Sequence, residues 1–266
     1  LFYSYIEGNQ MNITGVMFMW PLVRIESIKQ VKDRSLLFWT ILLPVASIIL
    51  LIELFTSGSS QAQKTLVASQ SVTGMSVFFS TFVIISIVIS FVKDREKGIV
   101  ARLASTPLQP HHFFLGKCVP FFIIILFQVL LLTILGVYLY GIEITQYSSY
   151  FLVVVLLSMQ VTSWGVAIAA FAKTENTGLV MTNMIALGTA VACGLWTPFD
   201  QLPSYLKIIG MLFPQYWAHQ GLVQSVSTLP GGENLILVTA VLIGYTLLWF
   251  ILSLVGYKKY IKRARG

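Results

Sequence analysis

Few side chains in this sequence stand where they could perform acid–base or metal chemistry. Two adjacent histidines, His111 and His112, are candidates for a metal site or a proton relay. Neighbouring residues of a helix point to different faces, however, and no carboxylate or cysteine is placed nearby to complete a ligand set. Glu53 ends a long apolar run, where an acid can mark an ion pathway, but it is close enough to the end to reach water. We therefore expect an interfacial histidine pair and a solvated Glu53.

The remaining candidates for chemistry are equally isolated. Asp200 and His219 stand between the last two long apolar runs, and we expect structural polar roles for both. The two cysteines, Cys118 and Cys193, lie inside apolar runs without metal-ligand spacing, which is typical of small buried hydrophobic residues. The sequence therefore predicts no catalytic residue and no metal site.

A phosphate-binding loop of the type Gly-x-x-x-x-Gly-Lys-Ser/Thr does not occur in the sequence. The nearest fragment is Gly116-Lys117, but the first glycine of the pattern is replaced by His111 and the hydroxyl residue by Cys118. The chain therefore lacks a phosphate-binding loop of this kind, and we assign no cofactor to it.

The composition explains why chemistry is scarce. The 266 residues are 56% hydrophobic and only 10% charged, with a mean hydropathy of +0.83. Soluble domains carry about 25% charged residues, so the side chains that would cover a water-exposed surface are missing. The net charge of +7 arises mainly from scarce acids, and the basic residues cluster beside apolar runs. This layout is typical of membrane topology and argues against disorder, a disulfide scaffold or nucleic-acid binding.

Six apolar segments are long enough to cross a bilayer, which takes roughly 20 helical residues. They are expected at 36–55, 72–92, 118–142, 150–172, 179–197 and 235–257. A seventh segment, at 203–226, is divided by Pro214 into two pieces that are each too short to cross. We expect these pieces to form a re-entrant helical hairpin within 198–227, marked by Pro198, Pro203, Pro214 and Tyr216.

The distribution of basic residues orients these spans. With six spans, 15 of the 17 Lys and Arg residues fall on one side, which the positive-inside rule assigns to the cytoplasm. The sequence thus predicts an all-α, multi-pass protein of the plasma (inner) membrane with both termini in the cytoplasm. The single transmembrane domain is expected at 36–257, followed by a basic cytoplasmic tail at 258–266. We treat residues 1–16 as an N-terminal extension and assign no function to them.

Residues 17–35 precede the first span and carry apolar residues at steps of three and four positions, with charges between them. This pattern predicts an amphipathic connecting helix at the inner interface. The alternative is a basic flank that only orients the first span. The basic residues of the segment 17–35 are Arg24, Lys29, Lys32 and Arg34.

The loop at 93–112, between spans two and three, has the most informative pattern. Ile99, Val100 and Leu103 form one face of a short helix that ends before Pro107, because the residue before proline is displaced from helical geometry. Such a coupling helix would transmit force from a soluble partner to both spans. The alternative, a solvated loop that obeys the positive-inside rule, accounts for the charges but not for the ordered motifs.

These motifs resemble those of type-2 ABC exporter permeases. The loop carries Arg95-Glu-Lys-Gly, then Arg102-Leu-Ala-Ser-Thr-Pro-Leu and Leu115-Gly-Lys. The re-entrant segment, with Leu202-Pro and Phe213-Pro-Gln-Tyr, is also similar, and the resemblance covers about 17–265. One departure is Ile99-Val100-Ala101, where members often carry Thr and a further polar or acidic residue.

The resemblance implies a half-transporter. Two permease copies, identical or different, would pair in the bilayer, and two ABC ATPase subunits holding ATP and Mg would dock on the connecting and coupling helices. The coupling interface would include Arg95, Glu96, Lys97, Gly98, Arg102 and Pro107. Spans two and five would line a cavity between the copies, for which the candidates are Ser76, Phe79, Ser80, Met181 and Asn183. The alternative for the small hydroxyl residues is close helix packing.

The function implied is export of a hydrophobic or amphipathic solute, such as a drug, an antimicrobial peptide or a lipid-like molecule. In one alternative the fold is the same, but the exported molecules are lipid-linked glycans or lipids. A second is an integral-membrane enzyme that modifies lipids, although the acids are scattered. A third, an ion-driven carrier or channel, is disfavoured by the lack of charge in the middle of the spans.

Overall fold

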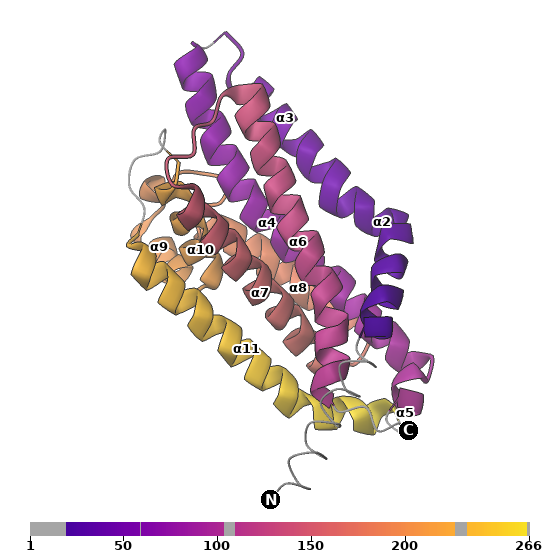
Figure 1. Cartoon of the computed structure of the whole chain (residues 1–266). Helices are drawn as coiled ribbons and strands as arrows, with labels where there is room; N and C mark the ends of the chain where they lie inside the picture. Colours follow the sequence, from indigo (N-terminus) through magenta and orange to yellow (C-terminus); the bar gives the residue numbers. More distant parts are fainter. Residues whose placement is uncertain (1–19, 59, 104–109, 227–232, 265–266) are drawn as a thin grey trace, which may run out of the picture.

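The computed structural model describes residues 20–58, 60–103, 110–226 and 233–264 (Figure 1). Within these ranges the chain is helical and contains no strand; one isolated antiparallel bridge joins Ile144 and Val226. The expectation of an all-α protein is confirmed. Because the expected extension at 1–16 precedes residue 20, it falls outside the described residues.

The N-terminal part consists of two helical sections that meet at Asp33. A helix over 20–32 ends there, and the Asp33 carboxylate accepts hydrogen bonds from the N–H groups of Ser35 and Leu36, capping α2 (Arg34–Leu37). A π-helical section, η1 (Phe38–Leu42), then leads into α3 (Leu43–Phe55). Pro44 has no N–H to donate to the carbonyl of Thr40, so the α-helical ladder is interrupted where the helix widens.

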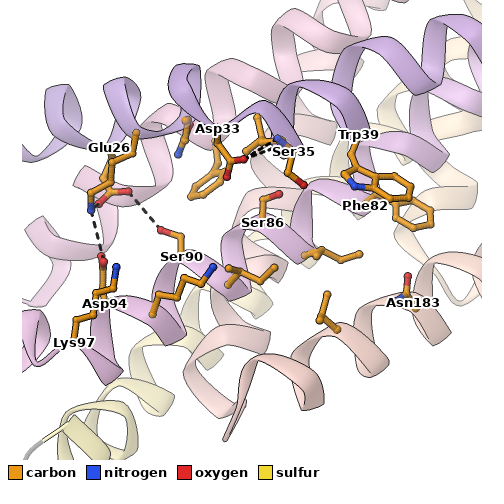
Figure 2. A pocket seen from close by; sticks show the side chains of 18 residues that line it. Glu26, Asp33, Ser35, Trp39, Phe82, Ser86, Ser90, Asp94, Lys97 and Asn183 are labelled. Atoms are coloured by element: carbon orange, nitrogen blue, oxygen red, sulfur yellow. Dashed lines mark hydrogen bonds and ion pairs between the residues drawn. The ribbon is translucent and has the colours of Figure 1, made fainter.

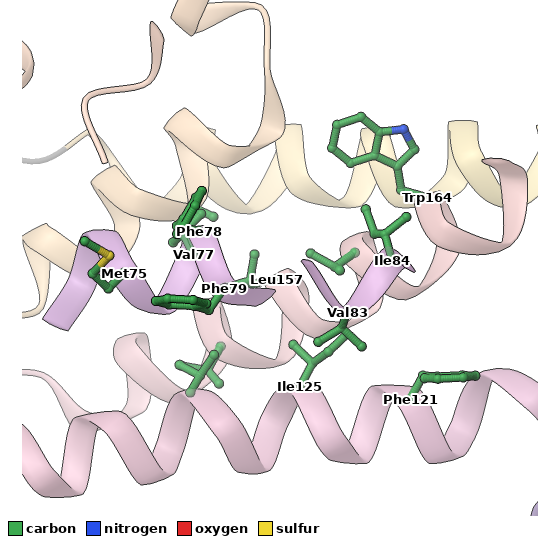
Figure 3. Packing of buried hydrophobic residues seen from close by; sticks show 14 of the residues in the cluster. Met75, Val77, Phe78, Phe79, Val83, Ile84, Phe121, Ile125, Leu157 and Trp164 are labelled. Carbon is green, nitrogen blue, oxygen red and sulfur yellow. The ribbon is translucent and has the colours of Figure 1, made fainter. Parts of the chain in front are cut away.

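The centre of the bundle is α4 (Gln61–Glu96), which packs against α3, α6 (Pro110–Tyr140), α7 (Tyr147–Phe171) and α8 (Glu175–Ala192). Its middle turns are buried among apolar side chains from α6 and α7 (Figure 3). The last long helix, α11 (Leu235–Ala264), lies along α7 (Figure 1).

Tertiary contacts define two ends of the bundle. At the first, which we call the α9 end, Thr65 donates a hydrogen bond to the carbonyl of Tyr140 (2.9 Å), and the N–H of Thr145 bonds to the carbonyl of Ser225 (3.0 Å). At the second, the α5 end, the hydroxyl of Tyr260 donates to the carbonyl of Phe91 (2.7 Å). The short helix α5 (Ile99–Leu103) and the end of α11 therefore lie together, away from α9 and α10 (Figure 1).

Among the described residues, five helical segments are long and apolar enough to cross a membrane. They are Arg34–Phe55, Gln61–Glu96, Leu115–Tyr140, Tyr147–Phe171 and Leu235–Gly256. The expected fifth span, 179–197, is not among these five segments. The helix found there, α8, covers Glu175–Ala192, and the chain turns at Gly194, whose φ is +67°. Glu175, Asn176 and Asn183 are among the 18 residues of α8, so this short helix lacks a continuous apolar run of spanning length.

The geometry of α8 is nevertheless that of a helix running the length of the core. Its start lies against α4 at the α5 end, where a Cβ added to Gly178 would touch Val88, and its end lies at the α9 end, where Leu195 meets Gly74. The helices α9 (Ser204–Met211) and α10 (Pro214–Gln224) follow at the α9 end and are only about 12 and 16 Å long at 1.5 Å per residue.

Gly74 provides a test of the close approach of α4 and the turn after α8. A Cβ on Gly74 would lie 1.9 Å from the carbonyl oxygen of Leu195, and this backbone atom can move only with its turn. We expect Gly74→Ala to lower the free energy of unfolding by about 1–3 kcal/mol, measured by thermal unfolding in detergent. The control is Gly244→Ala in α11, where nothing lies within 4 Å, and where stability should be unchanged or slightly higher. Equal stability of the two variants would contradict the packing described.

Candidate functional site

Four charged residues form a largely buried cluster at the α5 end, which we call the ionic cluster: Glu26, Lys29, Asp94 and Lys117. Lys117, in α6, has no exposed surface, and its ammonium group forms ion pairs with Asp94 of α4 and with Glu26 (3.4 Å) of the helix over 20–32. Lys29 pairs with Glu26 (2.8 Å) and Asp94 (3.6 Å). The cluster therefore joins three separate segments of the chain through groups of opposite charge.

The surroundings of Lys117 explain how a charge is tolerated there. The ammonium group lies 4.9 Å from the centre of the Phe91 ring and 6.0 Å from that of Phe113, so aromatic faces add to the two ion pairs. Gly116 lets the helix over 20–32 approach α6 closely, because a Cβ on Gly116 would lie 2.7 Å from the side chain of Leu22. With two acids and two lysines the cluster is charge-balanced, and removal of one partner would leave a buried charge uncompensated.

Lys29 is the half-exposed member of the cluster. Burial acts to lower the pKa of Lys29, but its hydrogen bond and ion pair with Glu26 and the charge of Asp94 outweigh this effect, so the pKa is raised. The lysine thus stays charged at neutral pH and holds the carboxylates in place.

A cavity of about 610 Å³ lies beside the ionic cluster (Figure 2). It is bounded by the helix over 20–32 with α2, by the second half of α4, and by the start of α8. One end is polar and holds Glu26, Asp94 and Lys97, whereas the other end holds Trp39, Phe82 and Asn183 (Figure 2). The cavity therefore changes from charged to aromatic along its length.

The residues expected at the coupling interface divide into two groups. Arg95 is buried: it donates hydrogen bonds to the carbonyls of Ala172 (2.9 Å) and Lys173 (2.6 Å), with its guanidinium 5.7 Å from the ring centre of Tyr260. It thereby ties the end of α4 to the α7–α8 turn and to α11.

The other coupling residues lie nearer the surface. Glu96, Lys97 and Arg102 are exposed, and Gly98 makes the turn between α4 and α5 with a φ of +69°. Pro107 falls outside the described residues. Their contact with an ATPase stays a prediction.

The residues expected to line a cavity are distributed differently. Ser76 and Ser80 are fully buried within one chain, Phe79 is buried among the aromatic rings of α4, and Met181 is exposed on α8. Only Asn183 lines the cavity described above. A cavity between two copies stays a prediction, since one chain is described.

The residues of the connecting helix also separate by environment: Arg24, Lys32 and Arg34 are exposed, and Lys29 belongs to the ionic cluster. At the α9 end, Pro203 immediately precedes α9, and Pro214 is the first residue of α10. Pro198 immediately precedes a short 3₁₀ turn. Tyr216 donates a hydrogen bond to Glu233 (3.1 Å), linking α10 to the segment before α11.

The candidates for chemistry are not brought together. His219 is buried on α10, its Nε2 lies 3.4 Å from the hydroxyl of Thr73, and burial lowers the pKa of His219 to about 4, so the ring is neutral at pH 7. Glu53 forms an exposed ion pair with Lys64 (2.9 Å). No group of three metal-ligating residues occurs in the described part of the chain, and the side chains of His111 and His112 lie outside it.

The comparisons with known proteins agree with this architecture. A family model described as ABC-2 type transporter matches residues 18–226, which include the cluster, the cavity and both short helices of the α9 end. The chain belongs to the ABC-2 type transporter family. It is a membrane-embedded permease of that family.

Individual relatives of this ABC-2 permease are named as transport and resistance proteins. The chain is 23% identical over 181 residues to the linearmycin resistance permease protein LnrN of Bacillus subtilis, covering 68% of this chain and 47% of that protein. It is 22% identical over 127 residues to the probable multidrug ABC transporter permease YbhR of Escherichia coli K12. This match covers 47% of this chain and 34% of YbhR. It is also 24% identical over 238 residues to YvfS of Bacillus subtilis, named as a transport permease. This match covers 87% of this chain and 91% of YvfS. The permease thus spans half or less of LnrN and YbhR.

Sequence reasoning missed three members of the ionic cluster and a polar residue of the cavity: Glu26, Asp94, Lys117 and Gln30. The available signal was Lys117, because it lies immediately before the predicted span at 118–142, where a lysine drawn into the bilayer would need a partner. Its partners lie 23 and 91 positions away, so the sequence alone does not identify them.

Lys117 and Lys64 form a matched pair for testing the ionic cluster. Lys117→Met would leave Asp94 and Glu26 buried with one cation fewer, and we expect a loss of about 3–5 kcal/mol in the free energy of unfolding. Lys64→Met removes an exposed ion pair and should cost about 0–1 kcal/mol. Thermal unfolding of the two purified variants measures the difference. A Lys117→Met protein as stable as Lys64→Met would show that the cluster contributes nothing.

Proposed function

We propose that this permease is the membrane subunit of an ATP-driven exporter, and that α5 receives the movement of a separate ABC ATPase. The observation that carries the proposal is the last turn of α4, which is fixed to every neighbouring segment. Asp94 joins it to α6 and the connecting helix, and Arg95 joins it to the α7–α8 turn and α11. A force on α5, which is separated from α4 by only two residues, would therefore move these segments together rather than bend one of them.

The exposed charges support α5 as the docking site. Glu96, Lys97 and Arg102 surround the turn at Gly98 and present both signs of charge at the same end. Charges of both signs suit a partner surface of mixed charge, and their complementarity fixes register and orientation more than it adds affinity.

A six-span topology with both termini in the cytoplasm is part of this proposal. It is supported by the course of α8, which runs from the α5 end to the α9 end antiparallel to α4. It is supported further by α11, whose start contacts α10 and whose end contacts Phe91. If α8 crosses and the hairpin of α9 and α10 does not, most basic residues fall at the α5 end, as the positive-inside rule requires of a cytoplasmic face of the plasma membrane.

The assembly would contain two permease copies and two ATPase subunits, with ATP and Mg held by the latter. One face of α8 supports pairing or lipid contact, because Val180, Met184, Leu187 and Val191 are exposed at helical spacing. The expected cargo is a hydrophobic or amphipathic solute. The charged-to-aromatic gradient of the cavity supports this class, as do the names of LnrN, which refers to linearmycin resistance, and YbhR, which refers to multidrug transport.

Charge reversal tests the coupling surface. In a permease copurified with its partner ABC ATPase, we expect Glu96→Lys with Arg102→Glu to abolish cargo-stimulated ATPase activity while membrane insertion and yield persist, because both side chains are exposed. The control reverses the exposed pair at the other end, Glu53→Lys with Lys64→Glu, and should keep stimulation. Normal stimulation in the Glu96/Arg102 variant would rule out α5 as the coupling element.

Cysteine labelling tests whether α8 crosses the membrane. In a background with Cys118 and Cys193 replaced by Ala, single cysteines are placed at Lys173, before α8, and at Asp200, after it. We expect a membrane-impermeant maleimide to label Asp200→Cys in intact cells and Lys173→Cys only after permeabilisation. Labelling of both positions from the same side would contradict the six-span topology.

A further inference from the structure

We propose that the cavity beside the ionic cluster is a binding site, complete within one chain, for an uncharged amphiphile whose polar part carries hydroxyl or amide groups. The inference rests on the proposed function, because it names the class of cargo and the place where that cargo first binds. The site is built from the helix over 20–32, α2, α4 and α8 (Figure 2).

Gln30 is the observation that points to a ligand. Its side chain lines the cavity and is only 5% exposed, yet neither its amide nitrogen nor its amide oxygen has a hydrogen-bond partner among the described residues. Buried polar groups are nearly always hydrogen-bonded, so an orphaned amide at a cavity wall calls for an occupant that both accepts and donates. Hydroxyl and amide groups do both, whereas a phosphate diester or a quaternary ammonium group does not.

The charges of the cavity argue against an ionic headgroup. The lining residues include three acids and three lysines, so neither sign is in excess. The acids are already engaged: Glu26 and Asp94 in the ionic cluster, and Asp33 in the cap of α2. A cationic ligand would have to compete with the lysines of the ionic cluster for buried carboxylates, which is costly. Lys93 and Lys97 are exposed, so an anionic ligand would gain little by pairing with them.

The length and polarity of the cavity fit an amphiphile. Along α4 the lining runs from Phe82 to Lys97, about 22 Å at 1.5 Å per residue. Hydroxyl groups of Ser86 and Ser90 lie between the aromatic end and the charged end. Trp39, at the aromatic end, is 49% exposed, so the cavity reaches the surface of the chain. An apolar chain would lie against Trp39 and Phe82, and the polar part would lie toward Gln30.

The test uses the permease–ATPase complex in lipid nanodiscs, without nucleotide, and three photoactivatable probes with the same diazirine-bearing alkyl chain. One probe is an alkyl glucoside, one an alkyl phosphate and one an alkyltrimethylammonium. We expect the glucoside to label the segments that line the cavity, 82–97 and 179–183, in competition with unlabelled glucoside. Stronger labelling of these segments by either charged probe, or labelling spread evenly over the lipid-facing helices, would overturn the inference.

Variants test whether Gln30 contributes to binding of the glucoside. We expect Gln30→Leu to lower glucoside labelling about fivefold, the usual effect of one lost hydrogen bond. The matched control is Gln128→Leu in α6, which replaces another buried amide without a partner that lies outside the cavity, and it should leave labelling unchanged. Ser86→Phe fills the cavity from α4 and should abolish labelling. Full labelling of Gln30→Leu and Ser86→Phe would overturn the inference.

The outcomes separate this inference from the proposed function. Glucoside-stimulated ATPase activity without labelling of the cavity would leave the exporter standing and remove this site. Specific labelling of the cavity in a complex whose ATPase never responds to the probe would support the site and count against ATP-driven export of this class.

Discussion

The architecture depends on one interaction, the burial of the Lys117 ammonium group between two carboxylates and two aromatic rings. A buried ammonium group needs opposite charges close by to offset the loss of its hydration, and here they come from α4 and from the helix over 20–32. The requirement fixes the depth of α6 relative to α4, because a shift of one turn would separate Lys117 from Asp94. It also draws the amphipathic helix onto the bundle through its polar face. Consequently the apolar side chains Trp20, Ile28 and Val31 are exposed on that helix, together with Arg24 and Lys32.

A second constraint, the junction made by Arg95, acts at the same level of the bundle. Its guanidinium donates hydrogen bonds to the carbonyls of Ala172 and Lys173, the two residues that follow α7. The hydrogen bond from Tyr260 to Phe91 adds a further link between helices at the α5 end. The α9 end has polar contacts of another kind, mainly hydroxyl groups bonded to carbonyls of neighbouring turns, such as Thr65 with Tyr140. The two ends can therefore respond differently to a force: the first as a unit, the second by small rearrangements of its turns.

The sequence predicted the helices well because an apolar run of about 20 residues has few other stable structures in a bilayer. It also placed the short helix at Ile99 and the proline-initiated pair at Pro203 and Pro214, since glycine and proline act locally. The position of α8 was less well predicted, because its end depends on a turn at Gly194. The ionic cluster and the inward position of Arg95 could not be derived, because they depend on which charged residues face each other after packing. A charge count treats Lys117 and Lys97 alike, although one is buried and the other exposed.

The position of the cavity suggests how cargo and ATPase could influence each other. Its walls are the connecting helix, α4 and α8, and its polar end is bounded by the ionic cluster that fixes the end of α4. A ligand that bridges these walls binds best to the arrangement in which they are close, so it would shift the population toward that arrangement. A partner that displaces α5 acts on the same end of α4 and would change the same distances. Because coupling free energy is reciprocal, any preference of the ligand for one arrangement must equal its effect on the partner's binding equilibrium. The ionic cluster is the element through which both effects would act, since Glu26 and Asp94 belong to the cavity wall and to the α4 junction at once.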